Sequence, residues 1–224
     1  MEKNSDVLII GGGVIGCAVA RELSRYEISI TVLEQAVDVA EGASKANSGI
    51  VHAGYDAEPG TLKARYNTAG ALMFQKLCEE IGVGYQRCGA LVIGFNEDDR
   101  STLEELKARG IINGVPDLRI IEHDELMAME PEINQTALCA LYVPTSAIVS
   151  PYEFTFALAD DAAANGVKFC FGKRAVQISH SASGQFTVLT DDDVWTCTVL
   201  INCAGASSVD LHNQISDRDR KSVV

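Results

Sequence analysis

Three glycines near the start of the chain have the types and spacing to do specific chemistry. Gly11, Gly13 and Gly16 directly follow a buried-type apolar run, Val7–Ile10. Strand, tight turn and helix in this order form the fingerprint of a dinucleotide site. Gly11 is expected to permit the turn, Gly13 to let the backbone approach a pyrophosphate, and Gly16 to let the helix pack on the strand. The start of that helix favours negative charge through its N–H groups and its dipole.

An acidic residue completes the pattern. Glu34 ends a second β-branched run, residues 28–33, near the offset of about 20 residues expected for an acid that binds a ribose hydroxyl. An acid at this position disfavours a 2′-phosphate, so the predicted ligand is FAD or NAD. Glu34 alone does not choose between them.

Composition limits the partners. The 224 residues carry 18 Lys and Arg against 31 Asp and Glu, a net charge of −13, which argues against binding to nucleic acid or to an anionic membrane surface. No apolar run approaches the roughly 20 residues of a membrane span. We therefore expect a cytoplasmic protein whose membrane association is at most peripheral.

The seven cysteines are scattered and contain no C-x-x-C pair. This spacing favours neither zinc nor a redox dithiol, so no metal site is predicted. Most of the cysteines lie in apolar runs, where they are interpreted as small buried hydrophobes.

The elements of the first half follow from periodicity. Residues 41–50 show neither strand nor helix period and are predicted to be an ordered loop. A strand is predicted over 90–95 and a helix over 97–109, capped by Asn96 and stopped by Gly110. Before them, residues 61–81 predict an amphipathic helix that ends at Gly82 and has the apolar stripe Leu62, Tyr66, Ala69, Met73 and Leu77.

The second half continues the mixture of strands and helices. Short strands are predicted at 118–121 and 138–143, with a short helix from His123 that Pro131 ends. Pro151 is the first position of a helix with Phe154, Leu158 and Ala162 as its buried stripe. Three strands follow at 167–171, 185–190 and 195–202, and the last leads into a second glycine turn.

Four segments together resemble the FAD-dependent oxidoreductases of the D-amino-acid-oxidase-like superfamily. They are Gly11–Gly16 with Glu34, Ala43–Gly54, Pro144–Pro151 and Val199–Gly205. Through residues 47–54 the chain is most similar to the glycerol-3-phosphate dehydrogenase and L-2-hydroxyglutarate dehydrogenase branch.

The resemblance implies an α/β fold class: a Rossmann-like FAD-binding domain with an interleaved α+β substrate domain, truncated at the C-terminus. The implied division is 1–82 and 149–212 for the FAD-binding domain, 83–148 for the first part of the substrate domain, and 213–224 for a tail. Because Asp219–Val224 matches one reading frame of a common sequencing adapter, the end of this tail is interpreted as non-biological sequence.

The same resemblance implies FAD as the cofactor and assigns residues to it. At Val176 this chain departs from the family pattern, since the polar residue usually found two positions earlier is the bulkier Arg174. The implied contacts are Gly11, Gly13 and Gly16 at the pyrophosphate, Glu34 at the ribose, Ser44, Asn47, Ser48 and Gly49 along the flavin, the Val176 backbone at the adenine, and Ala204 and Gly205 in the turn that closes over the cofactor.

The cofactor implies the reaction class. A hydride leaves a hydroxyl-bearing carbon for flavin N5 while a base removes the hydroxyl proton. His52 is the predicted catalytic residue, since an imidazole exchanges protons near neutral pH, although a structural histidine in the flavin wall fits equally. His123, His180 and His212 are interpreted as surface or structural residues.

The predicted substrate is a small anionic hydroxy compound, first glycerol 3-phosphate, with an unidentified electron acceptor as the second partner. Lys63 and Arg65 could supply the cation that an anionic substrate needs, or could be solvated side chains. The alternatives are L-2-hydroxyglutarate, an amino acid or amine, and, in another class, an NAD-binding regulatory module without flavin chemistry.

Overall fold

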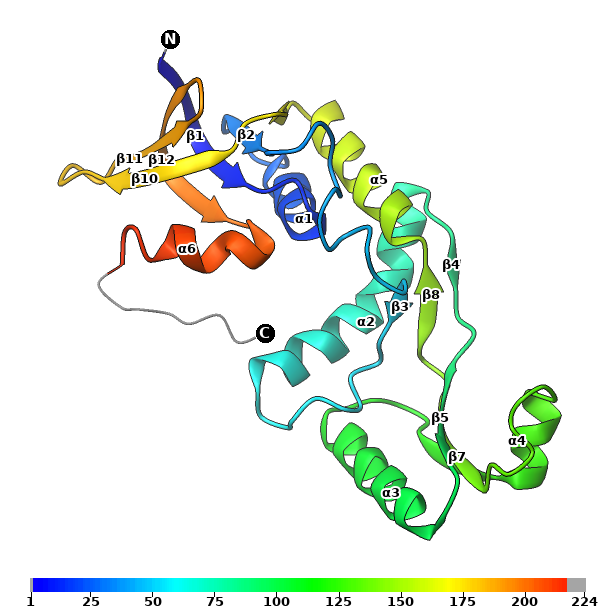
Figure 1. Ribbon diagram of the computed structural model, residues 1–224. Helices are drawn as coiled ribbons and strands as arrows, with labels where there is room; N and C mark the ends of the chain where they lie inside the picture. Colours follow the sequence, from blue (N-terminus) through cyan, green and yellow to red (C-terminus); the bar gives the residue numbers. More distant parts are fainter. Residues whose placement is uncertain (1, 217–224) are drawn as a thin grey trace. The chain divides into compact units, whose positions relative to one another are not determined.

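The structure is a computed structural model that describes residues 2–216 (Figure 1). The chain forms two compact units. Unit 1 contains the segments Met1–Ser48 and Pro151–Val224, and unit 2 is the segment Gly49–Ser150 between them. The predicted α/β class with a parallel sheet is confirmed. Residues 49–82, predicted to belong to the FAD-binding domain, lie in unit 2. The predicted tail end from Asp219 lies outside the described residues.

Unit 1 is built on a six-stranded sheet in the order β10-β11-β12-β1-β2-β9. The central strand β1 (Glu2–Ile10) runs parallel to β12 (Val194–Asn202) and to β2 (Ile30–Leu33), and β2 runs parallel to β9 (Lys168–Cys170). Because Ile10 lies beside Leu33 and Asn202, the carboxyl ends of three strands meet at one edge of the sheet. The strands β11 (Phe186–Thr190) and β10 (Ala175–His180) extend the sheet in antiparallel fashion.

Alternation along β1 gives the sheet two apolar faces. Val7 and Ile9 belong to one core cluster with Ala20 of α1 (Val14–Leu23) and Ala162 of α5 (Pro151–Ala164). The other face carries a second cluster, which includes Leu8, Ile10, Trp195 and Leu211. Leu211 comes from α6 (Ser208–His212), which follows a 3-10 turn at Gly205–Ser207. Both faces are therefore covered, as a parallel sheet requires.

Unit 2 contains two small antiparallel sheets. One has the order β5-β7-β6, formed by β5 (Ala90–Gly94), β7 (Cys139–Val143) and β6 (Arg119–Glu122). The other has the order β3-β8-β4, formed by β3 (Ile50–Val51), β8 (Ala147–Val149) and β4 (Tyr85–Gln86). Three helices accompany them: α2 (Leu62–Ile81), α3 (Glu97–Ile112) and α4 (His123–Met129).

The predicted helix ends are partly confirmed. Gly82 ends α2 in the left-handed conformation with a φ of 71°, and Asn96 Oδ1 accepts a hydrogen bond from Asp99 N at 2.9 Å at the start of α3. Gly110 was predicted to stop α3, and this prediction was wrong because the helix continues to Ile112. A Cβ at Gly110 would lie 2.3 Å from Leu118 Cδ1, so glycine is needed there for close packing.

The apolar stripe predicted for α2 does not form its buried face. Leu62, Tyr66 and Met73 are 68%, 62% and 67% exposed. The residues that α2 buries are instead Ala64, Thr68 and Cys78. By contrast, the stripe predicted for α5 is buried as expected.

Candidate functional site

The glycine turn at the end of β1 is built by backbone contacts that leave no room for a side chain at Gly11 or Gly16. Gly11 has a φ of +107°, and a Cβ on it would lie 2.3 Å from the carbonyl oxygen of Cys203. A Cβ on Gly16 would lie 1.9 Å from the carbonyl oxygen of Gly11. Gly13 is the N-cap of α1, and a Cβ on it would meet only Ser44 Oγ, at 3.1 Å. Two of the glycines are thus required by the turn itself, while Gly13 borders open space.

Glu34 fastens this turn to the end of β2. Its Oε2 accepts a hydrogen bond from Gly12 N at 2.6 Å, and its Oε1 accepts one from Ala36 N at 2.8 Å. Its own backbone joins the next chain segment, because Lys173 N donates to Glu34 O at 2.8 Å. The half-buried carboxylate therefore stands at the centre of the turn with a fixed orientation.

The loop after Glu34 contributes the side chain that caps α1. Ser44 Oγ accepts a hydrogen bond from Val14 N at 2.8 Å, and satisfies one of the free N–H groups at the start of the helix. Asn47 Nδ2 donates to the carbonyl oxygens of Ala43 and Ser44 at 3.1 and 3.0 Å, which holds the loop in shape. Sequence reasoning missed this capping because Ser44 is 30 residues away from the helix that it caps.

These elements border a cleft of about 620 Å³ within unit 1. Three predicted cofactor residues do not line this cleft. Gly16 is buried behind the turn, and Ser48 and Gly49 lie outside the lining. The other predicted cofactor residues all line it: Gly11, Gly13, Glu34, Ser44, Asn47, Val176, Ala204 and Gly205. The structure thus brings residues from five stretches of the chain to one cavity, within 10–15, 33–35, 41–47, 173–176 and 203–214.

A network of ion pairs supports the wall that leads to Val176. Lys173 Nζ lies 2.5 Å from Asp192 Oδ2 and 2.7 Å from Asp193 Oδ2, and Lys3 Nζ lies 2.9 Å from the same Asp193 oxygen. The hydrogen bond from Lys173, followed by the one from Lys3, lowers the pKa of Asp193 to about 2. Lys173 is therefore engaged by these carboxylates, although it also borders the cleft.

The two cysteines behind the glycine turn are inert in acid–base terms. Burial raises the pKa of Cys17 to about 12, and the negative charge of Glu34 and the neighbouring Cys203 add to the effect. Burial also raises the pKa of Cys203. Both stay thiols at neutral pH, which agrees with the interpretation of the cysteines as small apolar residues.

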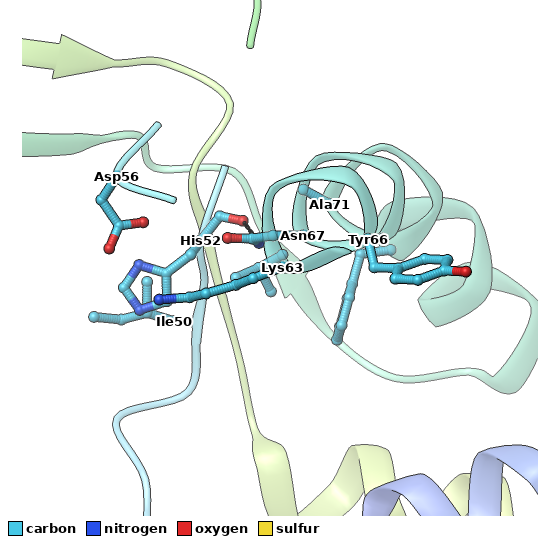
Figure 2. A pocket seen from close by; sticks show the side chains of 10 residues that line it. Ile50, His52, Asp56, Lys63, Tyr66, Asn67 and Ala71 are labelled. Atoms are coloured by element: carbon cyan, nitrogen blue, oxygen red, sulfur yellow. Dashed lines mark hydrogen bonds between the residues drawn. The ribbon is translucent and has the colours of Figure 1, made fainter. Parts of the chain in front are cut away.

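His52 lines a second cavity, of about 400 Å³, within unit 2. Its backbone oxygen accepts a hydrogen bond from Asn67 Nδ2 at 2.7 Å, while its ring has no hydrogen bond or ion pair with any residue between 2 and 216. In Figure 2 the side chains of Lys63 and Asp56 point toward the imidazole, and the ring of Tyr66 points away from it. The Asp56 carboxylate, the His52 imidazole and the Lys63 ammonium group therefore line one cavity.

Three of the remaining residues of chemical interest, Arg65, His123 and His180, make contacts away from this cavity. The guanidinium of Arg65 lies over the exposed Tyr66 ring at 5.4 Å and does not line the cavity of His52. His123 Nδ1 bonds to the carbonyl oxygen of Ala137 at 2.8 Å, and the His180 ring stacks on Phe186 at 4.3 Å. Both contacts agree with the interpretation of these two histidines as surface or structural residues.

Residues 2–216 offer neither a metal centre nor a membrane-spanning helix. No group of three or more potential ligand side chains gathers there in a way that could hold a metal ion. Nor does any helix in this range combine the length and the apolar character that a bilayer crossing requires.

Comparison with known proteins connects this geometry to a family. A family model described as "FAD dependent oxidoreductase" matches residues 6–223. A glycerol 3-phosphate dehydrogenase of Caloramator mitchellensis is 43% identical over 212 residues, which are 95% of this chain and 44% of the relative. The mitochondrial L-2-hydroxyglutarate dehydrogenase of Homo sapiens is 31% identical over 91% of this chain and 46% of its own length.

A solved structure shows the same likeness in three dimensions. The dithionite-reduced L-α-glycerophosphate oxidase from Mycoplasma pneumoniae, with FAD bound, superimposes with a TM-score of 0.92 at 33% identity, over 97% of this chain and 58% of that one. The chain thus spans about half the length of the curated relatives it matches. With the glycine turn, Glu34 and the parallel sheet in place, these matches show that the chain belongs to the family of FAD-dependent oxidoreductases.

Proposed function

We propose that this chain forms the cofactor-binding part of an FAD-dependent dehydrogenase that oxidises a small anionic hydroxy compound, with glycerol 3-phosphate as the first candidate. The observation that carries the proposal is the cleft of about 620 Å³ whose walls are the glycine turn, Glu34 and Val176, in a chain of this family. The substrate class is supported by the relative with 43% identity, which is named a glycerol 3-phosphate dehydrogenase. L-2-hydroxyglutarate is the second candidate because relatives named for it also match.

The residues of the cleft fit the cofactor. Gly11 and Gly13 have no side chain where a pyrophosphate would approach the backbone. The small residues Ala43, Ala204 and Gly205 leave space along the walls for flat rings. Two of the roughly four lone-pair sites of the Glu34 carboxylate are used by Gly12 N and Ala36 N. The others are available to a ribose hydroxyl.

Within the proposal, Gly11 and Gly13 hold the pyrophosphate, Gly16 supports their turn, and Glu34 holds the ribose. Ser44, Asn47, Ser48 and Gly49 run along the flavin, the Val176 backbone meets the adenine, and Ala204 and Gly205 close over the cofactor. When bound, FAD supplies a two-electron acceptor for the hydride of the hydroxyl-bearing carbon.

His52 is proposed to accept the hydroxyl proton. Its ring is exposed in a cavity and is not engaged by the residues that the structure describes, while Asn67 fixes its backbone. Lys63 borders the same cavity and would pair with the phosphate or carboxylate of the substrate. The alcohol would thereby become a ketone, and His52 would hold the proton that the hydroxyl group loses.

The test is an absorbance spectrum of the purified flavoprotein encoded by the gene that contains this chain. We expect flavin bands that are bleached by anaerobic glycerol 3-phosphate, and less so by L-2-hydroxyglutarate. A variant His52→Asn should keep the flavin bands and lose most of the bleaching rate. Flavin bands that neither compound bleaches would refute both candidate substrates, and a protein that takes up no added FAD would refute the proposal as a whole.

A further inference from the structure

One wall of the cleft is lined by Asp210 and Leu211 of α6, a helix of only five residues. A helix this short is not stable alone, so its position depends on its anchors. At its start, Asn202 Nδ2 donates to Ser208 O at 2.7 Å, and in its middle Leu211 is buried in the core beneath the sheet. Its third anchor is the residue two positions beyond its end, Gln214.

Gln214 binds the open edge of β10 with both ends of its side-chain amide. Its Oε1 accepts a hydrogen bond from Ile178 N at 2.7 Å, and its Nε2 donates to Val176 O at 3.3 Å. Since β10 is the outermost strand of the six, this amide takes the place of a peptide group from a neighbouring strand. Ile178 is only 4% exposed, so its N–H has little access to water as an alternative partner.

The same amide acts on an irregular point of the strand. The pairing of β10 with β11 shifts between Ala175 and Gln177, so Val176 is the extra residue of a bulge. Its carbonyl oxygen faces the open edge of β10, where no strand among the described residues pairs with it. Gln214 supplies this missing partner, and both Gln214 and Val176 line the cleft.

We infer that Gln214 is a positioning residue for the adenosine end of the cofactor: by joining α6 to the bulge of β10, its amide sets the distance between two walls of the cleft and the orientation of the Val176 peptide. This inference rests on the proposed function, because it takes the cleft to be the FAD site and the Val176 backbone to be the contact with adenine. Gln214 itself is not a catalytic residue.

The experiment compares the binding of ADP and IDP to apoprotein prepared from the flavoprotein, by titration calorimetry. The variant Gln214→Met keeps the length of the side chain and removes both hydrogen bonds. The matched control is Gln177→Met. It makes the same change at an exposed glutamine of β10 that does not border the cleft. The variant Gln214→Glu keeps an acceptor for Ile178 N but cannot donate to Val176 O, so it tests the adenine-side bond even if Gln214→Met folds poorly.

We expect Gln214→Met to weaken ADP binding by about 3- to 10-fold, the effect of losing roughly one net hydrogen bond, and to leave IDP less affected. The preference for ADP over IDP should therefore shrink in Gln214→Met and in Gln214→Glu, and stay at the wild-type value in Gln177→Met. A role confined to stability would weaken both nucleotides by the same factor and would overturn the inference.

Two further outcomes separate this inference from the proposed function. If the wild-type apoprotein binds no ADP, both the FAD site and the role of Gln214 are refuted. If ADP binds as expected while neither candidate substrate bleaches the flavin, only the proposed activity fails and the role of Gln214 stands.

Discussion

Glu34 should stabilise the fold even when no nucleotide is bound. The substitution Glu34→Gln leaves one acceptor oxygen where the carboxylate had two, and places an NH₂ group against a backbone N–H. One of the hydrogen bonds from Gly12 N and Ala36 N is then lost, and the other no longer reaches a charged acceptor. A hydrogen bond to a charged group contributes about 1.5–3 kcal/mol, so we expect the free energy of unfolding to fall by about 2 kcal/mol.

The assay is urea unfolding followed by the fluorescence of Trp195. This is the only tryptophan of the chain, and it lies buried in unit 1, in the core cluster that contains Leu33, the residue before Glu34. A lower midpoint with an unchanged dependence on urea would report a loss of stability. Adding ADP should widen the gap between wild type and variant, since the remaining lone pairs of Glu34 are proposed to bind the ribose.

The control is Glu41→Gln, which removes a carboxylate from the border of the same cleft. Among residues 2–216 Glu41 pairs only with the exposed Lys45, and a surface pair of this kind contributes about 0–1 kcal/mol. If Glu34→Gln unfolds at the same urea concentration as Glu41→Gln, the argument that Glu34 holds the glycine turn is wrong.

Three further predictions concern other parts of the chain. Gly110→Ala should lower the free energy of unfolding by about 1–3 kcal/mol because its Cβ would overlap packed side chains. Gly70→Ala, with open space around it, should be neutral or stabilising, and thermal unfolding of both variants checks this. Lys63→Gln should raise the KM for the anionic substrate several-fold at nearly constant kcat. Lys76→Gln, farther along the same helix, should leave the KM unchanged, and an equal effect of both variants would refute the role of Lys63. Asp193 has a lowered pKa, so its stabilising contribution is complete above about pH 4 and is lost as the pH falls toward 2; Asp193→Asn should therefore flatten the acid limb of the stability profile, and an unchanged limb would contradict this.

The sequence predicted the features that depend on local signals. The glycine turn, the cap at Asn96, the stop at Gly82 and the first helical position at Pro151 each follow from residues next to the element they affect. Gly82 and Gly110 show the limit of such signals. Both are glycines near the end of an apolar pattern, but only Gly82 adopts a positive φ, and the reason for Gly110 lies in residues that are distant in the sequence.

The missed features depend on partners far along the chain. The strand β10 was not predicted because its alternation of apolar and polar residues is short, and it forms through pairing with β11 on one side and Gln214 on the other. Ser44 was predicted along the flavin, whereas its bond to Val14 N could not be read from a spacing of 30 residues. The apolar stripe of α2 was correctly recognised as helical, but periodicity does not say which face the rest of the chain covers.

The two glycine turns of the chain form a single structure, and this bears on how the cofactor would bind. Cys203 N donates to Ile10 O at 2.8 Å, and the Cys203 carbonyl oxygen occupies the space in which Gly11 would carry a Cβ. The first turn is also held through Gly12, whose N–H binds Glu34 and whose carbonyl oxygen accepts a hydrogen bond from Ala40 N at 3.0 Å. Since these contacts come from the protein alone, the turn keeps its shape without a ligand. Cofactor binding would therefore cost little conformational entropy of the backbone. A substitution that shifts the backbone of the second turn should therefore weaken nucleotide binding at the first, even though the substituted side chain touches no phosphate.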